Sequence, residues 1–379
     1  MSNSALSPAI VSTFPPTACG LATFAAALAH GMEVNHATDV GIVRCSVDSL
    51  PANDDRIIAE LHPSRLRSIR EASIAINSFD CAFLQHEFGI FGGHDGDDVV
   101  RLMSHIRVPI VTTLHTIPSS PTTHQKRTLQ HVLKGSSRIV TMTDAARQRL
   151  LQFYDVDPLG VVTIPHGATL PPPVAPRPAP VPTVLTWGLL GPGKGIEWVI
   201  DALAAVSDVV PPITYLVAGR THPKVKACEG EKYRESLHER ARARGVESRV
   251  VFDELYRSVP ELVELARSAS VVVLPYDNAD QVTSGVLVDA VAAGVPVIAT
   301  DFPHARELLS DGAGIVVPHR DPDALARALR TVLTHHNVQR SMRARAEELA
   351  RHHDWTKVAA DYLDLVPAII GSSETAVAS

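Results

Sequence analysis

Cysteine is scarce in this sequence of 379 residues, and basic residues are not in excess. The cysteines Cys19, Cys45, Cys81 and Cys228 are far apart and show no paired spacing, so we expect neither a disulfide framework nor a zinc knuckle. Lys and Arg number 35 against 41 Asp and Glu, which gives a formal net charge of -6. We therefore expect no nucleic-acid partner, since such proteins usually carry a basic stripe. A local cationic pocket for a phosphorylated ligand remains compatible with this balance.

Long apolar runs are missing as well. No run approaches the ~20 residues of a membrane-spanning helix. The N-terminal segment MSNSALSP lacks the positively charged and apolar regions of a signal peptide. We therefore expect a cytoplasmic protein without an integral membrane span.

Proline, in contrast, is concentrated in one segment, PPPVAPRPAPVP at 171–182. Proline fixes φ and lacks an N–H, so this stretch is expected to be an extended, semi-rigid connector. The chain is long enough for two domains. We place an N-terminal domain at 1–172 and a C-terminal domain at 183–353. A terminal helix at 354–370 is expected to pack back across the N-terminal domain and complete it.

Short apolar runs alternate with helical patterns on both sides of the connector. The predicted strands are residues 9–14, 40–45, 81–85, 109–114, 138–143 and 161–164 before it, and 184–187, 214–218, 249–252, 270–274, 295–300 and 314–317 after it. Predicted helices include 196–206, 232–243 and 322–333. Apolar strands that alternate with helices indicate parallel sheets covered on both faces. The fold class is therefore α/β with two Rossmann-like domains, and we expect ligands between them at the carboxyl ends of the strands.

The first motif is TWGLLGPGKG at 186–195, between a predicted strand and a predicted helix. Glycines at such a turn let the backbone approach a ligand, and the following helix presents free N–H groups to an anion. Lys194 adds a mobile positive charge suited to a phosphate. The motif is neither a Walker A sequence nor a dinucleotide-binding fingerprint. The alternative is a tight turn with a solvated lysine.

The second motif is PYDNADQVTSGVLVDAVAAGVPVIATD at 275–301. A strand ends before its polar loop, and a helix begins near Ser284, where backbone amides are free. Gln281 lies in the loop, and Asp289 lies on the first turns of the helix. A carboxylate beside an anion-binding terminus suits the ribose and diphosphate of a nucleotide. The alternative is an acidic residue that merely favours the helix dipole.

Two loops of the N-terminal half also follow predicted strands. FPPTACGLAT at 14–23 contains Gly20 at the start of a helix, and QHEFGIFGGHDG at 85–96 contains His86 and Glu87. Histidines, an acid and aromatic residues at the end of a strand suit an acceptor pocket. Both loops could instead be purely structural.

Together these motifs resemble the retaining family-4 glycosyltransferases (glycosyl transferases group 1), which have the GT-B fold. GLLGPGKGIEWVIDAL and DQVTSGVLVDAVAAGVPVIATDFPHARELL are similar to the C-terminal half of that family. Other segments also resemble the family and occur in the family's order along the chain: TLHT, VTMTDAARQRL, VVTIPHGATL, GIVVPHRDPDALARAL and DWTKVAADYL. The resemblance covers nearly the whole chain and is weakest across 47–78.

The resemblance assigns roles to individual residues. Lys194 matches the lysine of a basic pair that clasps the donor diphosphate, whereas Leu189 stands at the arginine position, with Arg220 as the nearest substitute. Gln281 and Asp289 stand where the family has two acids, the first on sugar hydroxyls and the second on the ribose. Backbone amides toward the donor are implied for Thr283, Ser284, Gly285, Val286 and Leu287.

In the N-terminal half, Gly20 matches a glycine near the diphosphate, and His115 matches a histidine near the transferred sugar. His86 and Glu87 are expected on the acceptor side. The residues expected to act in catalysis are His115, Lys194 and Gln281. Asp95–Gly96–Asp97 spells the D-x-D of metal-dependent transferases, but the resemblance implies a GT-B enzyme that needs no metal or other cofactor.

The implied activity moves a hexosyl unit, mannose or glucose, from a GDP- or UDP-linked sugar to a carbohydrate or glycolipid acceptor, with retention of configuration. Two alternatives stay open. One is a catalytically degenerate nucleotide-sugar-binding protein, to which Leu189, Gln281 and Asp289 give some weight. The other is a sugar-nucleotide epimerase or a phosphorylase on the same scaffold.

Overall fold

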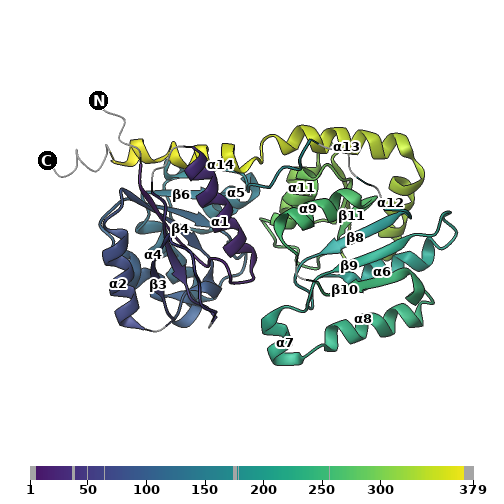
Figure 1. Cartoon of the computed structure of the whole chain (residues 1–379), viewed down its shortest axis with the longest axis horizontal. Helices are drawn as coiled ribbons and strands as arrows, with labels where there is room; N and C mark the ends of the chain where they lie inside the picture. Colours follow the sequence, from purple (N-terminus) through teal and green to yellow (C-terminus); the bar gives the residue numbers. More distant parts are fainter. Residues whose placement is uncertain are drawn as a thin grey trace. The chain divides into compact units, whose positions relative to one another are not determined.

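The chain folds into two compact units in the computed structural model, which describes residues 6–35, 39–48, 50–63, 65–173, 177, 179–255 and 257–370 (Figure 1). The first unit comprises Met1–Gly167 and Trp355–Ser379, and the second comprises Ala168–Asp354. The predicted connector falls at the start of the second unit, and its residues 174–176 and 178 lie outside the described residues.

The first unit is built on a seven-stranded parallel sheet with the order β3-β2-β1-β4-β5-β6-β7. Its strands are β1 (Pro8–Ser12), β2 (Gly41–Cys45), β3 (Ile57–Leu61), β4 (Cys81–His86), β5 (Ile110–Leu114), β6 (Arg138–Thr141) and β7 (Val161–Thr163). The winding direction reverses between β1 and β4. In sheets of this type, ligands bind at the carboxyl ends of the strands that flank such a reversal.

The degree of burial explains why most strands of this sheet could be predicted from the sequence and β3 could not. Every residue of β1, β2, β4 and β5 is buried, as expected where helices cover both faces of a parallel sheet. Strand β3 was not predicted. It lies at the edge of the sheet, most of its residues are only half-buried, and it contains the charged Glu60. It therefore lacks the continuous apolar run that marks the other strands.

Helices flank this sheet, and the last one comes from the far end of the chain. They are α1 (Gly20–Val34), α2 (Leu66–Ile76), α3 (Asp98–Met103), α4 (Thr123–Lys134), α5 (Asp144–Phe153) and α14 (Trp355–Leu363), with the short turns η1 (Phe88–Ile90), η2 (His94–Gly96) and η3 (Pro158–Gly160). Helix α14 packs against α1 (Figure 1). A Cβ atom on Gly31 would lie 2.7 Å from the Cβ of Ala359, so glycine permits this close approach. Helix α14 ends at Leu363, and a separate helical stretch occupies 366–370.

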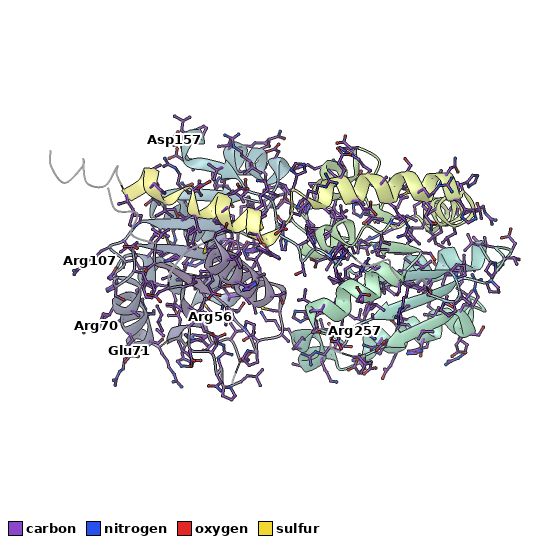
Figure 2. The ribbon with its side chains drawn as sticks, turned by 45° about the horizontal axis from the view of Figure 1, so that its top comes forward. Arg56, Arg70, Glu71, Arg107, Asp157 and Arg257 are labelled. Atoms are coloured by element: carbon purple, nitrogen blue, oxygen red, sulfur yellow. The ribbon has the colours of Figure 1, made fainter. Side chains whose placement is uncertain are left out.

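Arg56, labelled in Figure 2, connects the segment before β3 to the rest of the first unit. Its guanidinium donates to Asp54 Oδ2 at 2.8 Å and to Glu33 Oε1, on α1, at 3.1 Å. It also lies 5.3 Å from the ring centroid of Phe14, in the loop after β1. These contacts tie the edge of the sheet to α1.

The second unit contains a six-stranded sheet with the order β10-β9-β8-β11-β12-β13, also parallel throughout. Its strands are β8 (Thr183–Trp187), β9 (Thr214–Ala218), β10 (Val250–Asp253), β11 (Val271–Leu274), β12 (Val297–Thr300) and β13 (Gly314–Val317). Its helices are α6 (Ile196–Ala205), α7 (Pro223–Glu229), α8 (Lys232–Ala243), α9 (Val259–Ser268), α10 (Gly285–Ala292), α11 (Pro303–Leu309), α12 (Pro322–Thr334) and α13 (His336–Ala350), with the short turn η4 (Glu247–Arg249). The winding reverses between β8 and β11. The loops after these two strands are the motifs at 186–195 and 275–301.

Candidate active site

The loop that connects β8 to α6 is fixed by backbone hydrogen bonds on two sides. The N–H of Leu190 donates to the carbonyl of Arg220 at 2.9 Å, and the N–H of His222 donates back to Leu190 at 2.8 Å. From the loop after β11, the N–H of Asp277 donates to the carbonyl of Gly193 at 2.9 Å. The loop is therefore held between the segments that follow β9 and β11.

Gly195 makes the close approach of these two loops possible. It adopts a φ of +68°, and a Cβ atom there would lie 1.8 Å from the carbonyl oxygen of Pro275. Any side chain would collide with this backbone, and the positive φ alone disfavours other residues. The sequence motif thus contains a glycine that the geometry requires.

Lys194 precedes this glycine and points toward the loop after β11. Its side chain is half-buried, and Nζ lies 4.7 Å from the ring centroid of Tyr276. Burial lowers the pKa of Lys194, and no carboxylate in the described part of the chain pairs with it. A desolvated ammonium without a counterion is a favourable partner for an anionic ligand.

Helix α10 presents its N-terminus in the loop that follows β11. Ser284 is the N-cap, and its Oγ accepts from the N–H of Leu287 at 3.3 Å. The N–H groups of Gly285 and Val286 have no acceptor among the described residues. Such groups, with the helix dipole, form a binding site for anions.

The approach to α10 is shaped by a histidine that the sequence analysis did not single out. His304 Nδ1 accepts from the N–H of Ser284 at 2.9 Å, so Nδ1 carries no proton. Next to it, Thr283 Oγ1 is buried without a hydrogen-bond partner in the described part of the chain. His304 follows β12 and reaches Ser284 only through the tertiary fold, so no local pattern pointed to it.

The two polar side chains of the second motif differ in their surroundings. Gln281 is half-buried, and its Nε2 donates to the carbonyl of Thr283 at 3.1 Å. The carboxylate of Asp289 accepts no hydrogen bond and forms no ion pair among the described residues, and burial raises its pKa to about 7. Asp289 is therefore a poorly solvated acceptor near neutral pH.

Tyr276 connects the groups of the second unit. It lies beneath Lys194, and its pKa is raised chiefly by burial and in part by the nearby Asp289. Lys194, Ser284 and Asp289, which the sequence analysis singled out, therefore all lie near Tyr276. Arg220 lies beside the same loop through its carbonyl, while its side chain is exposed.

In the first unit, His115 follows β5 and lies beside the end of β4. Its Nε2 is 2.8 Å from Gln85 Oε1, which can only accept, so Nε2 carries the proton. The ring packs against Phe24 of α1 with the centroids 4.9 Å apart. Burial, assisted by His166 and His86, lowers the pKa of His115 to about 3. The side chain is therefore neutral at physiological pH.

His86 and Glu87 end β4 and begin its loop. His86 is 1% exposed, and neither ring nitrogen has a hydrogen-bond partner among the described residues. Burial lowers its pKa to about 4, and its ring packs against Phe88. Glu87 accepts a hydrogen bond from Thr116 Oγ1, in the loop that contains His115. Glu87, in the loop after β4, therefore lies next to the loop after β5 that contains His115.

Gly20 is the first residue of α1, one turn before Phe24. A Cβ atom at this position would meet nothing within 4 Å in the structure. The packing of the first unit therefore does not require glycine there. The sequence analysis did not single out Gln85 and Thr116, the partners of His115 and Glu87. Gln85 could have been found, because it is a polar residue at the end of an apolar strand.

Comparison with known proteins identifies this arrangement. Residues 181–335 match the family model of glycosyl transferases group 1. Phosphatidyl-myo-inositol mannosyltransferase from Mycobacterium leprae (strain TN) is 30% identical over 308 residues, which cover 77% of each chain. The chain belongs to the glycosyl transferases group 1 family.

Two further comparisons agree with this assignment. D-inositol 3-phosphate glycosyltransferase from Kineococcus radiotolerans is 29% identical over 260 residues, 62% of this chain and 58% of that protein, so the chain spans less than two thirds of this relative. The structure of Anabaena Alr3699/HepE in complex with UDP has a TM-score of 0.73 and 16% identity, and covers 96% of this chain and 100% of that chain. The two units therefore have the GT-B fold.

As a member of this family, the protein is a glycosyltransferase. The side chain of Leu189, which the sequence resemblance places at an arginine position, is half-buried. Among the described residues of the chain, no helix has both the length and the apolar character needed to cross a bilayer.

Proposed function

We propose that this glycosyltransferase moves a hexosyl group, mannose or glucose, from a GDP- or UDP-linked donor to a hydroxyl group of a carbohydrate or glycolipid acceptor, with retention of configuration and without a metal ion. The names of the relatives support the choice of the transferred sugar and of the acceptor. One is named for mannosyl transfer to phosphatidyl-myo-inositol, and another is named for D-inositol 3-phosphate. These names favour mannose as the sugar and an acceptor that contains an inositol ring.

The observation that carries this proposal is the set of unsatisfied groups in the second unit. Lys194 has no carboxylate partner, and the amides of Gly285 and Val286 have no acceptor among the described residues. A diphosphate would satisfy all three. Asp289, which has no described donor, would accept hydrogen bonds from the two ribose hydroxyl groups. Gln281 and Thr283 would supply further hydrogen bonds to the donor sugar.

In the proposed reaction, the acceptor hydroxyl oxygen forms a bond to the anomeric carbon on the face from which the diphosphate departs. The bond between that carbon and the diphosphate oxygen breaks, and the hydroxyl proton passes to a donor phosphate oxygen. The products are the glycoside and the nucleoside diphosphate. The protein then mainly positions the reactants and stabilises the negative charge on the departing diphosphate. Lys194, the α10 amides and Arg220 would supply this stabilisation in place of a metal ion.

The first unit would bind the sugar and the acceptor. His115 is neutral, so it would hold the transferred sugar through hydrogen bonds rather than charge. Neither ring nitrogen of His86 makes a hydrogen bond to a described residue, and the hydrogen bond from Thr116 orients Glu87. These groups suit the recognition of hydroxyl groups, which both donate and accept.

The test is a transfer assay with GDP-mannose, UDP-glucose and their related donors against inositol, inositol phosphates and phosphatidylinositol, with and without EDTA. We expect one donor to give a new glycoside whose anomeric configuration, read by NMR, matches that of the donor, at a rate that EDTA does not change. Inversion of configuration would exclude the retaining mechanism. Binding of nucleotide sugar without any transfer would favour a degenerate binding protein, and a change in the donor sugar itself would favour an epimerase.

A further inference from the structure

A cluster of imidazole and carboxylate groups lies in the first unit where the loops after β4 and β5 meet. His94 and Asp95 belong to η2, and His124 lies in the first turn of α4. Asp95 Oδ2 is 3.5 Å from His94 Nδ1 and 3.3 Å from His124 Nδ1. One potential ligand atom from each of the three residues lies within 4.8 Å of the others. No residue of this cluster has a role in the proposed sugar transfer.

We propose that His94, Asp95 and His124 bind a zinc ion, with a water molecule as the fourth ligand. Two imidazole nitrogens and one carboxylate oxygen are a ligand set that Zn²⁺ favours, and three protein ligands leave one position open. Tetrahedral zinc-ligand bonds of about 2.0–2.2 Å place the ligand atoms roughly 3.4 Å apart, a spacing that the two distances from Asp95 already match, so only the two histidines need to approach each other. His94 can supply this movement, because its side chain is 74% exposed. Mg²⁺ and Ca²⁺ prefer oxygen ligands, so the two histidines argue against them.

The environment of His124 gives independent support to this proposal. Its Nδ1 is buried and makes no hydrogen bond, although it faces Asp95. Its Nε2 lies 3.5 Å from Asp97 Oδ2 on the opposite side of the ring. Metal-binding histidines usually direct their second nitrogen to a carboxylate, which fixes the tautomer and the orientation of the ring. Asp97 is therefore a positioning residue for His124.

The backbone around the cluster holds these groups in place. Asp95 adopts a φ of +50°, a conformation that residues other than glycine rarely adopt. Gly93 has a φ of +82°, and a Cβ atom there would lie 2.0 Å from Asp97 Oδ1. Thr122 and Gln125 form a capping box that fixes the first turn of α4 and thereby His124. A groove of about 390 Å³, lined in part by Asp97 and His124, lies next to the cluster.

A zinc ion at this position would join the loop after β4, which contains Glu87, to the start of α4. Its expected effect is to stabilise the first unit, since an ion that binds only the native state raises the melting temperature. This effect does not depend on the identity of the donor or acceptor, so the proposal can fail or succeed independently of the proposed transferase reaction.

The test uses the untagged full-length protein after removal of metals with a chelator. Zinc binding is measured by equilibrium dialysis, and cobalt is added as a spectroscopic probe of imidazole and carboxylate coordination. The variant His94→Ala/His124→Ala is compared with the wild type. Two controls are His30→Ala, an exposed histidine of the first unit, and Cys228→Ser, an exposed thiol that could bind zinc elsewhere.

We expect the wild type and both controls to bind one zinc ion per chain and to melt at a higher temperature with zinc, whereas the double variant does neither. Asp97→Asn should bind zinc about 10- to 100-fold more weakly, as is typical when a carboxylate that orients a metal ligand is removed. Equal zinc binding by the wild type and the double variant would overturn the proposal, and so would the absence of zinc binding in the wild type. A folded double variant, shown by an unchanged circular dichroism spectrum without zinc, excludes misfolding as the cause.

Discussion

Two ionisable residues of the second unit, Lys194 and Asp289, have shifted pKa values. Lys194 is a half-buried cation whose pKa is lowered by burial, and Asp289 is an acid whose pKa is raised by burial to about 7. Both shifts arise because the charged form lacks a partner among the described residues. A nucleotide would supply the missing partners, an anion for Lys194 and hydroxyl donors for Asp289. The unpaired groups destabilise the protein without ligand, and nucleotide binding would remove this destabilisation.

Asp289 predicts a specific dependence of stability on pH. Its pKa is raised from 3.8 to about 7 in the folded chain, so between these values the folded state binds a proton that the unfolded state does not. The free energy of unfolding should therefore fall as the pH rises toward 7. The test is urea unfolding of the wild type and Asp289→Asn at pH 5 and pH 8. The free energy of unfolding of Asp289→Asn, relative to that of the wild type, should be higher at pH 8 than at pH 5 by about 1 kcal/mol or more. An identical pH dependence in the wild type and the variant would show that Asp289 titrates normally.

His115 predicts a separation of binding from turnover. The variant His115→Ala should retain the affinity for nucleoside diphosphate, because the diphosphate groups are assigned to the second unit. The transfer rate should fall by about 10²-fold or more, the scale expected when a positioning group is lost. Calorimetry with the nucleoside diphosphate and a transfer assay measure the two quantities. A parallel loss of both would mean that His115 contributes to nucleotide binding or to folding.

At the scale of elements, loops that follow adjacent parallel strands create the site. The loop after β8 is held by backbone contacts with the segments after β9 and β11, and Gly195 in its own sequence permits the close approach to the second of these segments. The N-terminus of α10 is placed likewise, by Ser284 as its cap and by His304 at the start of α11. Each loop therefore depends on the register of the sheet beneath it.

Two glycines of the β8 loop allow a matched comparison of steric effects. Gly195→Ala introduces both an unfavourable positive φ and a Cβ at 1.8 Å from Pro275, whereas Gly193→Ala introduces only the positive φ, because nothing lies within 4 Å. We expect Gly193→Ala to cost about 1–2 kcal/mol of stability. Gly195→Ala should cost clearly more and should also weaken nucleotide binding. Denaturant unfolding and calorimetry check this order, and equal effects of the two variants would contradict the assigned contact.

At the scale of the whole molecule, the sequence revealed the architecture better than the individual contacts. Buried β-branched runs made most strands visible, whereas the edge strand β3, half-buried and containing Glu60, had no such pattern. Lys194 and Ser284 were found because strand ends and helix starts leave local signals. His304 and the partners of His124 were not, because those contacts join segments that only the fold brings together.

Helix α14 shows how the first unit depends on the end of the chain. Tyr362 is fully buried, its hydroxyl lies 3.1 Å from Thr113 Oγ1 on β5, and its ring lies near Phe83. Tyr362→Ala should destabilise the first unit by about 3–5 kcal/mol, the range for loss of a large buried aromatic side chain. Tyr362→Phe, which removes only the hydrogen bond, should cost about 1 kcal/mol. Equal, small effects in chemical denaturation would show that α14 is not part of this core.

The central claim is that Lys194 and the start of α10 bind the diphosphate of a nucleotide sugar without a metal ion. The most direct measurement is a thermal-shift screen of the wild type and Lys194→Met against UDP, GDP, ADP and their sugar conjugates, with and without magnesium. One nucleotide series should raise the melting temperature of the wild type equally in both conditions. Lys194→Met should bind that nucleotide about 10- to 150-fold more weakly, the loss expected for a charge-assisted hydrogen bond of about 1.5–3 kcal/mol. No shift with any nucleotide, a shift that requires magnesium, or equal shifts in both proteins would contradict the account.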